Sequence, residues 1–128
     1  MSTHIKNVHK RTLPKFGLDI PVFTRLYDFY KELSQAVILF PKHKKYTLGQ
    51  SLDRTTLKIL RLLFSVSGND KKTIVLKRMN LEIDLLKVLL RLSKDTGALP
   101  DKRYLDLSLG LHEIGKMTGG WIRYLKGL

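Results

Sequence analysis

The sequence contains no cysteine, and this absence excludes several kinds of functional site. Among its 128 residues there is no thiol to form a disulfide, ligate a metal ion, attack a substrate or act as a redox switch. Acidic residues are also scarce, because 11 Asp and Glu stand against 24 Lys and Arg, for a formal net charge of +13. This excess favours a polyanionic partner, and composition alone does not decide between nucleic acid, an acidic protein and an anionic membrane surface.

Long apolar runs are absent as well. No stretch of about 18 apolar residues, the length that a membrane-spanning helix needs, occurs without a charge. Residues 1–15 lack the apolar run of a signal peptide, so we expect no membrane span and a cytoplasmic location. Apolar residues still make up 43% of the chain, which is enough for the core of a single folded domain.

Helical periodicity dominates from Pro21 onward, and the alternation typical of β-strands is not sustained. The spacing of apolar residues predicts four helices, at about 21–40, 46–67, 70–96 and 101–125. With short turns between them, they predict an all-α, up-down-up-down antiparallel four-helix bundle over residues 21–128. Residues 1–20 have too few spaced apolar side chains for a stable helix, and we predict a flexible basic arm there.

The third predicted helix carries two apolar stripes. One stripe consists of Leu76, Met79, Ile83, Leu86 and Leu90. The other consists of Ile74, Leu81, Leu85, Val88 and Leu92. A helix at the edge of a monomeric bundle presents one apolar stripe of about 100° or slightly more. The second stripe therefore indicates burial either at the centre of the bundle or against another subunit.

Glycines interrupt the fourth predicted helix at Gly110, Gly115, Gly119 and Gly120. Each costs about 1 kcal/mol relative to Ala in a helix interior, so we expect a compensating close approach of another backbone. The alternative is that Gly119 and Gly120 end the helix and leave residues 121–128 as a separate tail. Earlier in the chain, Gly68 and Asn69 suit a left-handed cap at the end of the second helix.

No catalytic or metal-binding constellation is evident. The segment from Gly110 to Met117 matches all but the last position of the phosphate-loop pattern GxxxxGK[ST], but Met117 has no hydroxyl for Mg²⁺ and no strand precedes it. His112 and Glu113 begin an HExxH pattern whose fifth position is Lys116. Acidic residues mostly lie three or four positions from a basic one, as in surface ion pairs. We therefore expect no enzymatic activity, no cofactor, no metal site and no small-molecule substrate.

Basic residues instead form stripes along two of the predicted helices. Lys87, Arg91 and Lys94 follow one another at helical spacing on the third helix. Arg54, Lys58 and Arg61 do so on the second helix, and Lys42, Lys44 and Lys45 crowd the turn before it. Because few acidic residues interleave with either stripe, we expect a sustained positive potential that suits an extended polyanion. No motif that reads bases is present, so binding would involve mainly backbone phosphates.

Four short motifs, in this order, resemble one family. They are Leu26-Tyr27-Asp28-Phe29-Tyr30, Phe40-Pro41-Lys42 with Tyr46-Thr47-Leu48-Gly49-Gln50-Ser51-Leu52, Leu89-Leu90-Arg91-Leu92-Ser93-Lys94-Asp95, and Glu113-Ile114-Gly115-Lys116-Met117-Thr118-Gly119-Gly120-Trp121. Together they are similar to the Avd-type four-helix bundle family over roughly residues 21–125. That family includes the accessory variability determinant of diversity-generating retroelements and related proteins encoded in intervening sequences of bacterial 23S ribosomal RNA genes.

The resemblance implies a homopentameric barrel of bundles with a basic surface and no enzymatic activity. In retroelements it implies association with the reverse transcriptase and with template RNA or cDNA during mutagenic copying. We place partner binding first on the stripe of Lys87, Arg91 and Lys94. The candidate subunit contacts are Leu76, Met79, Ile83, Leu86, Leu90, Gly115, Gly119 and Trp121.

Two other roles remain open from the sequence. One is that of the ribosomal intervening-sequence proteins, which share the bundle and are distinguished by the genes around them. The other is a scaffold whose basic face binds an acidic protein without any nucleic acid.

Overall fold

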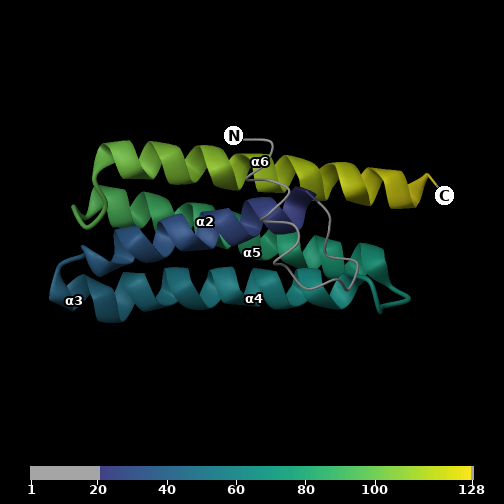
Figure 1. Ribbon diagram of the computed structural model, residues 1–128, viewed down its shortest axis with the longest axis horizontal. Helices are drawn as coiled ribbons and strands as arrows, with labels where there is room; N and C mark the ends of the chain where they lie inside the picture. The colour runs from purple at the N-terminus through teal and green to yellow at the C-terminus, as the bar shows by residue number, and fades with distance from the viewer. Residues whose placement is uncertain (1–20, 128) are drawn as a thin grey trace, which may run out of the picture.

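Four long helices form the structure, a computed structural model that describes residues 21–127 (Figure 1). They are α2 (Pro21–Ile38), α4 (Gln50–Val66), α5 (Lys72–Asp95) and α6 (Asp101–Lys126). Two short elements, α3 (Lys42–Lys44) and the π-helical turn η1 (Lys45–Gly49), precede α4. No strand occurs in the described part, and this all-helical architecture agrees with the expected four-helix bundle. The predicted arm at residues 1–20 lies outside the described residues.

The long helices surround a single apolar core. Helix α5 packs against α4 and α6, and α2 packs against α6 and α4, so α2 and α5 lie diagonally opposite each other (Figure 1). Each helix supplies side chains spaced three and four residues apart, such as Leu26, Phe29 and Leu33 from α2, which are 1–3% exposed. Burying one such Leu or Phe side chain contributes about 1.5–3 kcal/mol to stability.

The basic segment between α2 and α4 is helical, where we expected a connection. Lys42, Lys44 and Lys45 lie in α3 and at the start of η1, which leads directly into α4. Gly49, the last residue of η1, is buried against α2, and a Cβ there would lie 3.0 Å from Val37 Cγ1. The π-helical turn thus brings the backbone close to α2 at a position where only glycine avoids displacing Val37.

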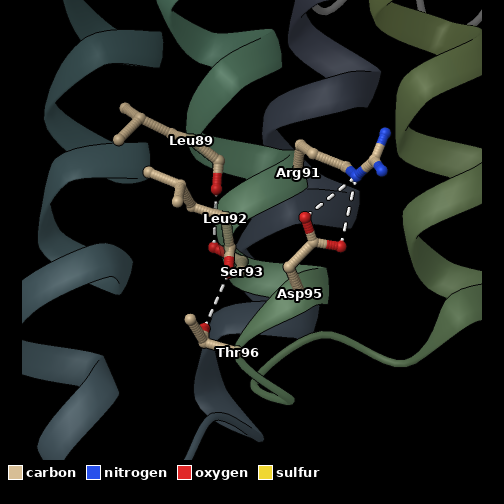
Figure 2. Close-up of polar contacts among 6 residues, drawn as sticks. All are labelled: Leu89, Arg91, Leu92, Ser93, Asp95 and Thr96. Carbon is tan, nitrogen blue, oxygen red and sulfur yellow. Dashed lines mark hydrogen bonds and ion pairs between the residues drawn. The ribbon is translucent and has the colours of Figure 1, made fainter.

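Helix α5 ends in a left-handed cap at Gly97, which has φ of 81°. The backbone amides of Ala98 and Leu99 donate to the carbonyl oxygen of Ser93 at 2.9 and 3.0 Å. Figure 2 shows the hydroxyls of Ser93 and Thr96 donating to carbonyl oxygens one turn earlier in the same helix. Gly97 is the one glycine with positive φ among residues 21–127, so the left-handed cap expected at Gly68 does not form.

Helix α6 continues without a break through Gly119 and Gly120 to Lys126, as Figure 1 shows. The alternative of a separate tail after Gly120 is therefore wrong. Trp121 is half-buried and lines a hollow of about 190 Å³ together with Pro21 and Val22 at the start of α2. Trp121 also packs against the apolar core, so the last turns of α6 remain part of the bundle.

Candidate nucleic-acid interface

The basic stripe on α4 is partly neutralised. Lys58 forms an ion pair with Glu82 of α5, with 3.1 Å between Lys58 Nζ and Glu82 Oε2. Arg54 and Arg61 are exposed, and neither belongs to any of the three ion pairs formed within residues 21–127. The stripe therefore keeps two unneutralised guanidinium groups, separated by seven residues, or about 10 Å along the helix at 1.5 Å per residue.

The stripe on α5 lies on the flank of the helix that faces α6, and two of its members are engaged there. Arg91 Nε donates to both carboxylate oxygens of Asp95, at 3.1 and 3.0 Å, on the side of α5 away from α4 (Figure 2). The hydrogen bonds to Asp95 raise the pKa of Arg91. Lys94 Nζ lies 5.1 Å from the centroid of the Tyr104 ring of α6, a cation–π contact.

Lys87 is the member of this stripe that remains exposed without an ion pair in the described chain. Its side chain crosses toward α6, since Lys87 Nζ is 3.8 Å from the position that a Cβ would take at Gly115. We expected almost no acidic partners along the two stripes, and this expectation is wrong at Lys58 and Arg91. Lys58 pairs with Glu82 of another helix, and Arg91 pairs with Asp95 one turn further along its own helix.

Lys42, Lys44 and Lys45 extend the basic surface to the end of the bundle. Lys42 is exposed, whereas Lys44 and Lys45 are half-buried along α3 and η1. None of the three belongs to the ion pairs found among the described residues. Lys45 also lines a hollow that Arg54 and Arg61 border, so the structure brings together basic residues from two of the predicted groups.

That hollow lies on the seam between α2 and α4 and has a volume of about 510 Å³. A second hollow of about 350 Å³ lies on the same seam, closer to the start of α2. Between them, the Tyr30 hydroxyl of α2 donates a hydrogen bond of 2.6 Å to Asp53 Oδ1 of α4. That bond and, less strongly, burial raise the pKa of Tyr30, so the hydroxyl is protonated at neutral pH. Tyr30 and Asp53 were not predicted as site residues, because they lie 23 positions apart and no local spacing links them.

The structure reverses the roles expected for the two apolar stripes of α5. The candidate contact stripe of Leu76, Met79, Ile83, Leu86 and Leu90 is only 0–1% exposed, so it forms the core of this chain. Side chains without accessible surface cannot contact a second subunit. The other stripe, which we call the outer stripe, is exposed by 45–69% and consists of Ile74, Leu81, Leu85, Val88 and Leu92. It is the apolar face of α5 that remains available.

The remaining candidate subunit contacts lie on α6. Gly115 faces α5 of the same chain, because a Cβ there would lie 3.8 Å from Ile83 Cγ2. At Gly119 a Cβ would meet the side chain of Arg123 in its own helix at 3.6 Å. The distance at Gly115 is an ordinary van der Waals distance to a side chain, so the close approach of another backbone expected for these glycines is not found there. Trp121 packs near the start of α2, as described above.

Other kinds of site find no support in this part of the molecule. Within residues 21–127, His, Asp and Glu side chains do not gather in groups of three that could hold a metal ion. None of the described helices is both long enough and apolar enough to cross a membrane. What the described residues do present is basic side chains at two seams of the bundle, between α2 and α4 and between α5 and α6, and an apolar outer stripe on α5.

Fold and surface together define a class of small, basic, antiparallel four-helix bundles. The sequence profile of the bAvd-like family matches residues 22–125, and the chain belongs to this family. The family resemblance inferred from the four sequence motifs is thereby confirmed. Among curated proteins, no match was found.

Proposed function

We propose that the protein is a non-enzymatic accessory protein of a diversity-generating retroelement, which binds the reverse transcriptase and template RNA or cDNA. The observation that carries this proposal is the basic surface of a bAvd-like bundle, in which Lys87, Arg54 and Arg61 have no acidic partner in the described chain. Unneutralised Lys and Arg side chains attract phosphates and release counterions when they bind them. In this role the protein needs no cofactor, metal ion or small-molecule substrate.

The proposal includes assembly of the chain into a homo-oligomer, a pentamer by the family resemblance. The outer stripe of α5 supports assembly, because contiguous exposed apolar surface of this kind marks interaction sites in proteins. Leu81, the most exposed of its residues at 69%, lies near the middle of the stripe. A shared apolar contact would place several basic surfaces on one particle and increase its attraction for nucleic acid.

The test is a triple charge reversal on α5, Lys87→Glu with Arg91→Glu and Lys94→Glu. We expect it to abolish co-purification of reverse transcriptase and RNA, while light scattering still reports the oligomer. The matched control reverses three exposed basic residues of α6, Lys116→Glu with Arg123→Glu and Lys126→Glu. It therefore has the same net charge as the α5 variant.

Two outcomes would contradict the proposal. Retained binding of reverse transcriptase and RNA by the α5 variant would exclude this stripe as the docking site. Co-purification of an acidic protein that survives nuclease treatment, without reverse transcriptase or RNA, would favour the scaffold role instead.

A further inference from the structure

The seam between α2 and α4 is the most open junction of the bundle, since these two helices pack together less extensively than any other neighbouring pair of long helices. Figure 1 shows α2 inclined to α4, with its N-terminal end near α6 and its C-terminal end near α3. Both hollows of about 510 and 350 Å³ lie along this seam, and Leu57 lines both of them. We call the two hollows together the α2–α4 groove, with a larger and a smaller compartment on either side of the hydrogen bond between Tyr30 and Asp53.

The larger compartment is basic. Lys45, Arg54 and Arg61 line it. Its other lining residues are polar or apolar, among them Ser34, Gln50, Val37, Ile38 and Leu57. The one acidic residue among its lining, Asp53, accepts the hydrogen bond from Tyr30. Asp53 adds one negative charge to the compartment, but none of the three basic side chains forms an ion pair within residues 21–127. Guanidinium groups bind phosphate through paired donors, so this compartment suits the backbone of a nucleic acid.

The smaller compartment is apolar and aromatic. Its lining includes Leu26, Leu57 and Leu60 with the ring of Tyr30, and Lys31 lies at its edge over the ring of Tyr27. Thr56 also borders it, and its hydroxyl donates a hydrogen bond of 2.8 Å to the carbonyl oxygen of Leu52. The hydrogen bond to Asp53 restrains the Tyr30 side chain at the boundary with the basic compartment. An aromatic ring held beside a phosphate-binding surface is the arrangement that single-stranded nucleic-acid sites use for stacking a base.

We propose that the α2–α4 groove binds a single-stranded segment of nucleic acid. Phosphates lie against Lys45, Arg54 and Arg61, and an unpaired base enters the smaller compartment beside Tyr30. A paired base cannot do so, because its edges and faces are occupied within the duplex. This inference rests on the nucleic-acid binding in the proposed function and adds a site, separate from the α5 stripe, that selects single strands.

The first test removes two charges from the groove. A labelled 12-nucleotide oligouridylate is titrated against the full-length wild type and against Arg54→Ala with Arg61→Ala. We expect the variant to bind at least about tenfold more weakly, with the slope of log affinity against log salt smaller by about 1.4, at 0.7 per lost phosphate contact. Lys77→Ala with Arg78→Ala, two exposed residues of α5, removes the same charge outside the groove and should leave affinity within about threefold.

The second test addresses the stacked base. Tyr30→Leu removes the ring and should weaken oligouridylate binding about tenfold, whereas Tyr30→Phe keeps the ring and should bind within about threefold of wild type. A 12-base-pair RNA duplex should bind wild type and Tyr30→Leu equally. Equal losses on duplex and single strand would show that Tyr30 acts through the fold, and would overturn the stacking role. Thermal melting of each variant checks that the bundle is intact.

The outcomes separate this inference from the proposed function. If the wild type binds neither single strands nor duplexes, the proposed nucleic-acid role fails. If the wild type binds oligouridylate and the Arg54, Arg61 and Tyr30→Leu variants bind it equally well, the groove proposal fails while the proposed function stands.

Discussion

The two apolar stripes of α5 have similar composition and opposite environments. Leu85 and Leu86 are neighbours in the sequence, yet the Leu85 side chain is 45% exposed and the Leu86 side chain is 0% exposed. Leu86 faces the core shared by the four helices, whereas Leu85 belongs to the outer stripe on the opposite side of α5. Equal hydrophobicity therefore says little about the energetic role of a residue until its neighbours in space are known.

The largest expected effect comes from the buried stripe. Leu86→Ala removes a fully buried side chain and leaves a cavity, so the free energy of unfolding should fall by about 2–5 kcal/mol. Urea denaturation followed by helical circular dichroism measures this change. A loss below about 1 kcal/mol would show that the core collapses around the site or that Leu86 is not central to it.

Next in size is the effect of charging the outer stripe. Leu81→Glu with Leu85→Glu should convert the proposed oligomer to monomer, because two desolvated carboxylates in an apolar contact are costly. Light scattering coupled to size exclusion measures the mass. Gln35→Glu with Ser65→Glu, at exposed polar positions of α2 and α4, adds the same charge elsewhere and should keep the wild-type mass. An unchanged oligomer in the Leu81 and Leu85 variant would exclude the outer stripe as the subunit contact.

The smallest effect is expected at Leu85 within the monomer. Introduced alongside Leu81→Glu, so that association does not contribute, Leu85→Ala should change the free energy of unfolding by less than about 0.5 kcal/mol. The same urea experiment used for Leu86→Ala measures it. If both alanine substitutions cost the same, the distinction between the two stripes of α5 is wrong.

Much of the fold was predictable, because helical periodicity is a local property of the sequence. The four helices, and Gly97 as the end of the third, follow from the spacing of apolar residues and from the conformational freedom of glycine. The helical character of residues 42–45 and the π-helical form of η1 were not predicted. The turn η1 depends on Gly49 lying against Val37 of α2, and no pattern within a lysine-rich segment signals such a contact.

The candidate site was predictable in part, for a similar reason. Basic residues at helical spacing identified the stripes, but the partner of Lys58 is Glu82 of another helix. Acidic and basic residues three positions apart, as in Asp28 with Lys31, Asp84 with Lys87 and Glu113 with Lys116, do not form ion pairs with each other in the described chain. The ion pairs that do form within a helix are spaced four residues apart, Arg91 with Asp95 and Lys102 with Asp106. Side-chain geometry, more than spacing alone, selects which pairs close.

By itself, the sequence determined that this chain is helical, strongly basic, free of cysteine and related to the bAvd-like family, because composition and periodicity need no knowledge of packing. The tertiary structure decided which stripe of α5 is core and which is surface, and which basic side chains keep their charge unpaired. It also decided that Tyr30, Arg54 and Arg61 border one groove. These properties depend on contacts between residues far apart in the chain, which form only when the helices pack.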